Sequence, residues 1–295
     1  MEIQKSGMIA IVGRPNVGKS TLINALAGEK IAIVSAKPQT TRNRICGIIN
    51  RGGVQFVLMD TPGLHKPKSR LGEYMVKVVR ESVADVDAAL MLVPPVERIG
   101  EPEQELLQRI RTLNIPTILV INKIDTVAPE ALFPVIEAYR AAYAFHAVIP
   151  VSAKLGDGVE LVLEELAGLM PEGPALFPED MVSDQPEKQM IAEIIREKML
   201  LTLDKEVPHG VAVEIMKFSE RDNGIVDVGA TIYCERESHK GIIIGKRGAR
   251  LKQIGVMARK DIEAFMGTKV FLETWVKVKE NWRDSNAMLR NFGYE

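Results

Sequence analysis

The first group of candidate functional residues is a glycine-rich stretch near the amino terminus. Gly13, Gly18, Lys19 and Ser20 fit the spacing of a phosphate-binding loop between an apolar run and a helical pattern. Glycines let backbone amides turn towards phosphates, the helix amino end adds partial positive charge, and Lys19 adds a full charge. A plain glycine-rich turn is the alternative. The predicted phosphate site consists of Gly13, Arg14, Pro15, Asn16, Val17, Gly18, Lys19, Ser20 and Thr21.

A second motif, Asp60-Thr61-Pro62-Gly63, directly follows an apolar run that ends at Met59. Asp60 is therefore expected at the carboxyl end of a strand, the edge at which such sheets bind ligands. We assign Asp60 to Mg²⁺ and the Gly63 amide to the terminal phosphate of a nucleotide. Taken alone, the aspartate could simply form a turn or cap a helix.

Two further motifs indicate which base is bound. Asp125 closes an Asn-Lys-x-Asp motif after the apolar run 117–121. Its carboxylate could accept hydrogen bonds from N1 and the 2-amino group of guanine, whereas adenine offers no such pair. The phosphate loop, Asp60–Gly63, Asn122–Asp125 and Ser152–Lys154 each follow a predicted strand, and these four motifs in this order predict GTP binding. An ATPase or a small-molecule kinase would leave Asp125 without a role. The predicted guanine site consists of Asn122, Lys123, Asp125, Ser152, Ala153 and Lys154.

A polar loop, Pro38–Arg42, is expected to act as a switch that responds to the terminal phosphate. A threonine in it could ligate Mg²⁺, and we choose Thr41 over Thr40; an ordinary connecting loop is the alternative. The predicted Mg²⁺ ligands are Ser20, Thr41 and Asp60, and the predicted switch and terminal-phosphate residues are Thr40, Thr41, Asp60, Thr61, Pro62 and Gly63.

Leu64 follows the second motif at the place where GTPases such as Ras carry a glutamine that orients the attacking water. Because leucine cannot form a hydrogen bond, we expect slow intrinsic hydrolysis with the water held by other groups. His65 could be proposed as a base, but we expect a solvated loop residue.

These motifs need a sheet to position them, and from about residue 7 to 170 short apolar runs alternate with helical patterns. This predicts a mostly parallel α/β sheet with crossover helices. Gly52 and Gly53 leave no room for a helix between two runs, so these should form an antiparallel hairpin at one edge. The predicted strands are 8–12, 45–49, 54–59, 88–93, 117–121 and 147–151. One predicted helix begins at Gly18, and the others cover 69–82, 101–113, 129–143 and 158–169.

A proline-rich stretch marks a domain boundary, so we expect a nucleotide domain at 1–172, a linker at 173–186 and a second domain at 187–295. In the second domain we predict helices at 187–203 and 250–265 and strands at 211–217, 225–235 and 270–279.

Gly245-Lys246-Arg247-Gly248 lies just before the second of these helices, and two glycines around two cations would let a nucleic-acid backbone come close. Residues 236–260 contain eight Lys or Arg and one acidic residue, Glu237. This favours RNA binding by a KH domain over a solvated helix face or a protein-docking module. The predicted RNA-binding residues are Gly245, Lys246, Arg247, Gly248, Arg250 and Lys252.

Composition restricts the class of protein further. A net charge of −1 over 295 residues indicates neither disorder nor a globally basic nucleic-acid binder. Cys46 and Cys234 are too few and too far apart for a disulfide framework or a zinc site. Without a leader or an apolar run near the roughly 18 residues of a membrane span, we expect a cytoplasmic protein.

The motifs together resemble those of the Era family of bacterial GTPases, over essentially the whole chain. The stretches that carry the resemblance are Gly13–Thr21, Pro38–Arg42, Asp60–Leu64, Asn122–Asp125, Ser152–Lys154, Glu193–Lys198 and Gly245–Gly248. The resemblance implies a P-loop GTPase domain followed by an α+β KH domain of type II, with GTP, GDP and Mg²⁺ as ligands.

The resemblance also implies partners and a location. A family member would bind small-subunit ribosomal RNA near its 3′ end during subunit assembly, under control of its GTP or GDP state. It would act as a cytoplasmic monomer with peripheral contact to the inner face of the cell membrane. Asn16 matches the position that binds K⁺ in some relatives, so the resemblance extends to K⁺ assistance of hydrolysis.

Overall fold

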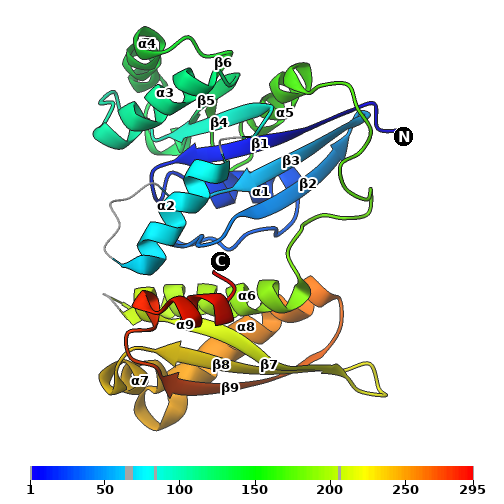
Figure 1. Cartoon of the computed structure of the whole chain (residues 1–295), viewed down its shortest axis with the longest axis vertical. Helices are drawn as coiled ribbons and strands as arrows, with labels where there is room; N and C mark the ends of the chain where they lie inside the picture. The colour runs from blue at the N-terminus through cyan, green and yellow to red at the C-terminus, as the bar shows by residue number, and fades with distance from the viewer. Residues whose placement is uncertain (1, 64–68, 83–84, 205–206, 295) are drawn as a thin grey trace. The chain divides into compact units, whose positions relative to one another are not determined.

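The computed structural model describes residues 2–63, 69–82, 85–204 and 207–294 (Figure 1). The chain divides into two compact units. One takes in residues 1–67 and 75–184, and the other takes in 68–74 and 185–295.

The first unit contains a six-stranded sheet with the order β2-β3-β1-β4-β5-β6. Only β2 runs antiparallel to its neighbour β3, and the other pairings are parallel. The predicted hairpin at one edge and the mostly parallel sheet are therefore confirmed. The strands are β1 Lys5–Gly13, β2 Ile45–Arg51, β3 Val54–Asp60, β4 Ala88–Val93, β5 Thr117–Asn122 and β6 Ala147–Val151.

Helices cover both faces of this sheet because successive strand residues point to opposite sides. In β1, Ile9 packs in the core cluster that includes residues of α1 and α5, while Ala10 packs in the cluster of α3 and α4. The predicted helix at 129–143 begins with a 3₁₀ turn, Pro129–Ala131, before the α-helix starts. The helices are α1 Lys19–Ala27, α2 Arg70–Ser82, α3 Glu101–Leu113, α4 Leu132–Ala142 and α5 Val159–Leu169.

The segment that the sequence suggests as a linker is hydrogen-bonded to the first unit as far as Asp184. The Ile48 amide donates to the Val182 carbonyl over 2.9 Å, and the Cys46 amide donates to Asp184 Oδ1 over 2.9 Å. Further back, the side chain of Gln55 accepts hydrogen bonds from the amides of Leu176 and Phe177. Residues 176–184 are therefore attached to the β2–β3 hairpin, and residues 182–184 cover part of the free edge of β2, which would otherwise expose unpaired backbone groups.

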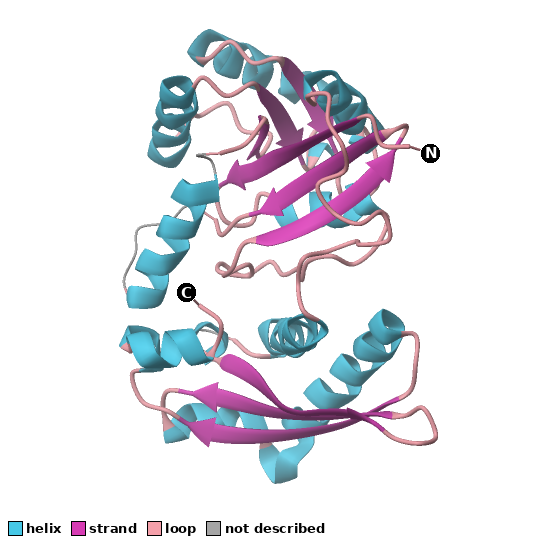
Figure 2. Cartoon of the chain, turned by 45° about the vertical axis from the view of Figure 1, so that its right-hand side comes forward, coloured by secondary structure: helices cyan, strands magenta, loops and turns pink. Residues whose placement is uncertain are grey.

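The second unit is an α+β domain with a three-stranded sheet of order β7-β8-β9 (Figure 2). Strands β7 and β8 are antiparallel, whereas β8 and β9 are parallel. The elements are α6 Glu187–Thr202, β7 Ala212–Glu220, β8 Val226–Cys234, α7 Glu237–Ile244, α8 Ala249–Met266, β9 Val270–Val278 and α9 Asn286–Asn291.

Helix α7 is an element that the sequence analysis missed. Its last residues are a run of three isoleucines, Ile242 to Ile244, which shows no helical period. Only Ile243 is fully buried, and Ile242 is exposed. One apolar side chain towards the core is too weak a signal for an amphipathic helix.

Both cysteine thiols are buried, and burial, together with the charge of Asp184, raises the pKa of Cys46 to about 12. The thiolate is the reactive form, so we expect neither cysteine of the folded protein to react with a maleimide at pH 8 within minutes. Mass spectrometry should show no label before unfolding and two labels in guanidinium chloride. Fast labelling of the folded chain would contradict the burial of these residues.

Candidate functional site

The glycine-rich loop joins β1 to α1, and its glycines stand where no other residue fits. Gly13 has a φ of 152°, and a Cβ there would lie 2.4 Å from the Leu92 carbonyl oxygen. Gly18 has a φ of 99°, and its Cβ would lie 2.2 Å from the Nδ2 of Asn122. The close approach of Asn122 ties the loop to the end of β5, so the phosphate and base motifs share one framework.

Lys19 lies at the start of α1 with its ammonium group inside the loop. Its Nζ donates hydrogen bonds to the carbonyl oxygens of Gly13 and Arg14, each over 3.1 Å. Burial lowers the pKa of Lys19 to about 8, against the opposing effect of the Asp60 charge. Phosphate oxygens brought to this position would favour the charged ammonium, as a phosphate-binding role requires.

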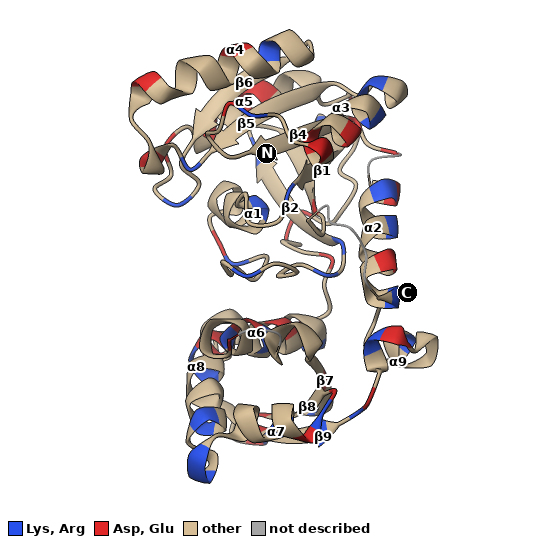
Figure 3. Ribbon diagram, turned by 90° about the vertical axis from the view of Figure 1, so that its left-hand side faces the viewer, with Lys and Arg blue, Asp and Glu red and all other residues tan. Residues whose placement is uncertain are grey.

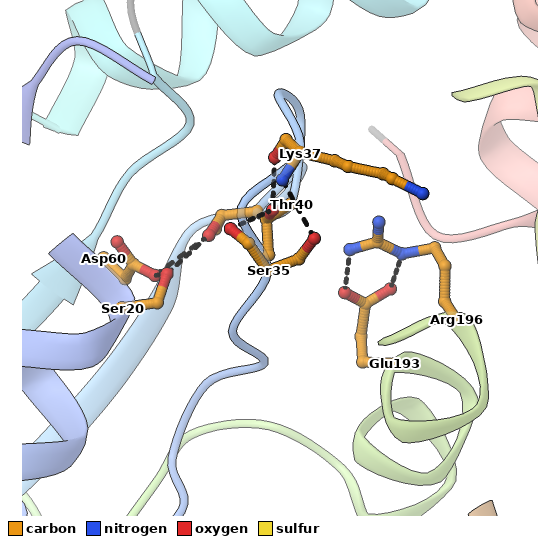
Figure 4. Close-up of polar contacts among 8 residues, drawn as sticks. Ser20, Ser35, Lys37, Thr40, Asp60, Glu193 and Arg196 are labelled. Atoms are coloured by element: carbon orange, nitrogen blue, oxygen red, sulfur yellow. Dashed lines mark hydrogen bonds and ion pairs between the residues drawn. The ribbon is translucent and has the colours of Figure 1, made fainter. Parts of the chain in front are cut away.

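Ser20, Thr41 and Asp60, which the sequence analysis predicts as Mg²⁺ ligands, are joined to one another by hydrogen bonds. Figure 4 shows Ser20 beside Asp60. Ser20 Oγ donates to Asp60 Oδ2 over 2.7 Å, and Thr41 Oγ1 donates to the same oxygen over 3.0 Å. Burial raises the pKa of Asp60 despite the charge of Lys19 and these two hydrogen bonds. Its other oxygen, Oδ1, is buried and accepts no hydrogen bond from the described residues.

This oxygen-only set fits Mg²⁺, which prefers carboxylate and hydroxyl oxygens together with substrate phosphates. Ser20, Thr41 and Asp60 would hold the ion, which supplies positive charge at the outer phosphates when bound.

The switch loop contributes to the same pocket. Ser35, Gln39, Thr40 and Thr41 line it together with the glycine-rich loop and Gly63. The Thr40 hydroxyl turns back into its own loop and donates to the Lys37 carbonyl over 2.7 Å (Figure 4). The Thr41 hydroxyl instead lies 3.0 Å from Ser20 Oγ. The geometry therefore favours Thr41 over Thr40 as the metal-facing residue.

The rest of the second motif is packed against the first. The buried Thr61 hydroxyl donates to the Ile11 carbonyl over 2.7 Å, which fixes the end of β3 to β1. A Cβ on Gly63 would lie 2.7 Å from the backbone of Pro15, so only glycine allows this approach. Leu64 and His65 lie outside the described residues, and their expected roles stay predictions.

The base motifs converge at the ends of β5 and β6. Asn122 Oδ1 accepts from the amides of Lys123 and Ala153, and its Nδ2 donates to the Val17 carbonyl. Asn122 thus links the two base motifs to the phosphate loop. Lys123 Nζ donates to the Asn16 carbonyl over 2.5 Å.

Asp125 is exposed, and its Oδ1 accepts a hydrogen bond from Ser152 Oγ over 2.7 Å. Ser152 is fully buried and therefore holds the carboxylate in a fixed direction. Such a carboxylate can receive the two adjacent N–H groups of a guanine edge, as predicted.

In the second unit, the basic glycine loop joins α7 to α8. Gly245 has a φ of 71°, and its Cβ would lie 2.7 Å from the Cβ of Arg250. Arg247 has a φ of 50°. Lys246 and Arg247 are exposed, so their charges are available to a phosphate backbone. Arg250 also donates to the Ile242 carbonyl, which joins the ends of the two helices.

A groove between α8 and β9 opens beside this loop. Gly248 and Lys252, two of the predicted RNA-binding residues, line this groove, but the sequence analysis assigned no RNA-binding role to the other residues of its walls. Lys252, Val256 and Arg259 lie on one face of α8 because of their spacing, and this spacing could have predicted that they line a common surface. Figure 3 shows Lys and Arg along this helix. The groove is lined by Gly248, Leu251, Lys252, Gly255, Val256, Arg259, Leu272 and Thr274.

Comparison with known proteins identifies both units. Residues 8–123 match the family model described as 50S ribosome-binding GTPase, and residues 206–283 match the KH domain model. GTPase Era of Ruminiclostridium cellulolyticum is 52% identical over 291 residues, which are 99% of this chain and 98% of that protein. The chain belongs to the Era family of GTPases.

Other Era proteins agree. Era of Alkaliphilus metalliredigens is 50% identical over 99% of both chains. A crystal structure of Era in complex with MgGDPNP and nucleotides 1506–1542 of 16S ribosomal RNA is 39% identical, with a TM-score of 0.95 over 99% of both chains. Aquifex aeolicus Era bound to GDP and aluminium fluoride has the same TM-score over 98% of this chain and 99% of that chain.

The chain is therefore a GTPase with the α/β and KH folds of the Era family. In phosphoryl transfer the protein mainly positions the phosphates and stabilises developing charge. Lys19 and the loop amides can do this for the outer phosphate oxygens. Gly63 packs closely against the phosphate loop at Pro15, and its predicted contact with the terminal phosphate stays a prediction. Among the described residues, no helix is long and apolar enough to cross a membrane.

Proposed function

We propose that this chain is a GTP-controlled RNA-binding factor that recognises small-subunit ribosomal RNA near its 3′ end during subunit assembly. One observation carries the proposal. The same chain contains a guanine-nucleotide site and a basic clamp, the loop Gly245–Gly248, which lies beside a groove. Support comes from the related Era crystallised with MgGDPNP and a 16S ribosomal RNA segment. The match described as 50S ribosome-binding concerns residues 8–123 alone and so says nothing of the KH domain.

A second candidate function is a GTPase whose KH domain only docks proteins. The exposed Lys246 and Arg247 between two glycines favour RNA, because these features suit a phosphate backbone rather than an apolar protein surface.

Filter binding with an RNA of the 16S 3′-end sequence and a scrambled RNA tests the choice. The RNA proposal predicts tight binding of the first RNA and weaker, salt-sensitive binding of the second. Gly255→Leu provides a matched variant, since no heavy atom lies within 4 Å of a Cβ there and the side chain would fill the groove. It should abolish the preference; unchanged binding by this folded variant would contradict RNA recognition in the groove.

Nucleotide control has a physical route along the edge of the sheet. Asp184 accepts from the amide of Cys46, and the neighbouring Ile45 pairs with the Mg²⁺-facing Asp60. The chain that leads to the KH domain is thus held on the first unit next to the switch-loop end of β2. A shift of Thr41 towards bound Mg²⁺ and the terminal phosphate would move this attachment.

Asp184→Ala is therefore expected to reduce the difference in RNA affinity between the GTP-analogue and GDP forms, while GTP hydrolysis persists. Asn50→Ala is the control, because Asn50 holds the same segment through the Glu179 carbonyl at the far end of β2. RNA titrations of both variants in the two nucleotide states measure the effect. An unchanged difference in Asp184→Ala would exclude this route.

We further propose that K⁺ assists hydrolysis beside Asn16, whose backbone has a left-handed φ of 64° and whose carbonyl receives Lys123. Hydrolysis in KCl should exceed that in NaCl, and Asn16→Ala should remove the difference. Equal rates in both salts would oppose the proposal.

Location and oligomeric state are proposed from the family. We propose a cytoplasmic monomer with peripheral contact to the inner membrane. Liposome flotation and light scattering test the two points. A dimer in light scattering would contradict the monomer, and the absence of any lipid binding in flotation would contradict the membrane contact.

A further inference from the structure

A buried carboxylate on α3 contacts the phosphate loop. Glu103 lies in the first turn of α3, and only 2% of its surface is exposed. Its Oε1 forms an ion pair with Nε of Arg14, the residue after the first glycine of the loop. Neither carboxylate oxygen accepts a hydrogen bond within the part of the chain described, so Arg14 and the amino end of α3 compensate its charge.

The surroundings of Glu103 fix where this carboxylate can lie. A Cβ on Gly100 would lie 2.8 Å from its Oε2, so a larger residue before the helix would force this carboxylate to shift. On the other side, burial and the charge of Glu103 raise the pKa of Tyr139, whose hydroxyl is fully buried on α4. That hydroxyl has no hydrogen-bond partner among the described residues.

Arg14 connects the buried Glu103 to the phosphate-binding Lys19. Its side chain is held by α3, while its carbonyl oxygen accepts the hydrogen bond from Lys19 Nζ over 3.1 Å. The next residue, Pro15, is in turn the residue that Gly63 approaches closely. The first half of the loop is thus held by α3 through Arg14, and it packs against Gly63 through Pro15.

We propose that Glu103 is a positioning residue for the GTPase site, which holds Arg14 and through it sets the loop backbone that orients Lys19. This role differs from a contribution to folding. An ion pair between the buried Glu103 and the partly exposed Arg14 contributes little to stability by itself, and replacing both partners of such a pair by neutral groups of similar size is often neutral or stabilising.

A double-mutant cycle separates the two roles. Arg14→Met leaves the buried Glu103 carboxylate unmatched, Glu103→Gln leaves the partly exposed Arg14 without its partner, and the combined variant removes both charges. We expect each single change to lower both the melting temperature and the affinity for fluorescent GDP, the latter by about tenfold. In the combined variant, the melting temperature should recover while the GDP affinity stays low.

Glu105→Gln is the control, since Glu105 is exposed on the same helix, and it should bind GDP as the parent chain does. Glu103→Asp keeps the charge on a shorter side chain and should recover part of the lost affinity. If Glu103→Gln does not fold, the combined variant decides the question. Parent-like GDP affinity of the folded combined variant would overturn the proposal and leave the pair a purely structural role.

Discussion

Asp125→Asn should lower the affinity for GTP by at least about a hundredfold and raise the affinity for xanthosine triphosphate. The carboxylate of Asp125 is held by the buried Ser152 and can accept from both N–H groups of the guanine edge. An asparagine amide would oppose the 2-amino group with a donor. Xanthine carries a carbonyl there, which the new amide could meet. Competition of each triphosphate against fluorescent GDP measures the exchange of specificity.

The control for this change is Asp157→Asn. Asp157 lies near the same base pocket but contacts Ser152 only through its backbone carbonyl, so its neutralisation should leave GTP affinity unaltered. If Asp125→Asn still preferred GTP, or lost both triphosphates equally in a folded chain, the assignment of Asp125 to the base would be wrong.

Charge reversal of the clamp, Lys246→Glu with Arg247→Glu, is the second large expected effect. Both side chains are exposed on a loop whose glycines allow close approach of a phosphate backbone. Two repulsive charges there should weaken binding of the 3′-end RNA by about a hundredfold or more at moderate salt. GTP hydrolysis should be unaffected, because the change lies outside the nucleotide unit. RNA titration and phosphate release measure the two properties.

Lys269→Glu with Lys279→Glu makes the same change in net charge at exposed positions outside the clamp and groove. This control variant should keep most of the RNA affinity. Equal losses in the two variants would show that overall charge, rather than the clamp, governs binding.

Much of the nucleotide domain could be predicted because its sequence signals are local. Apolar runs such as 88–93 and 117–121 have no polar interruption, which is typical of strands buried on both faces. Helix α7 escaped because only one of its three consecutive isoleucines is buried. The attachment of residues 176–184 to β2 also escaped, since backbone pairing at a sheet edge leaves little trace in side-chain types.

The site residues also divide into those that local motifs predict and those that only the fold reveals. Gly13, Lys19, Asp60 and Asp125 belong to contiguous motifs and could be predicted from spacing. Glu103 is far from Arg14 in sequence, and in the first turn of α3 it reads as an ordinary acidic residue near a helix amino end. Only the fold shows that its carboxylate is buried against the phosphate loop.

Control of RNA binding by the nucleotide state can be tested in a single comparison. The affinity of the full chain for the 16S 3′-end RNA should be determined with saturating non-hydrolysable GTP analogue and with saturating GDP, at the same Mg²⁺ and salt. We expect clearly different affinities in the two states, with the difference reduced in Asp184→Ala. Equal affinities in the parent chain would contradict nucleotide control of RNA binding.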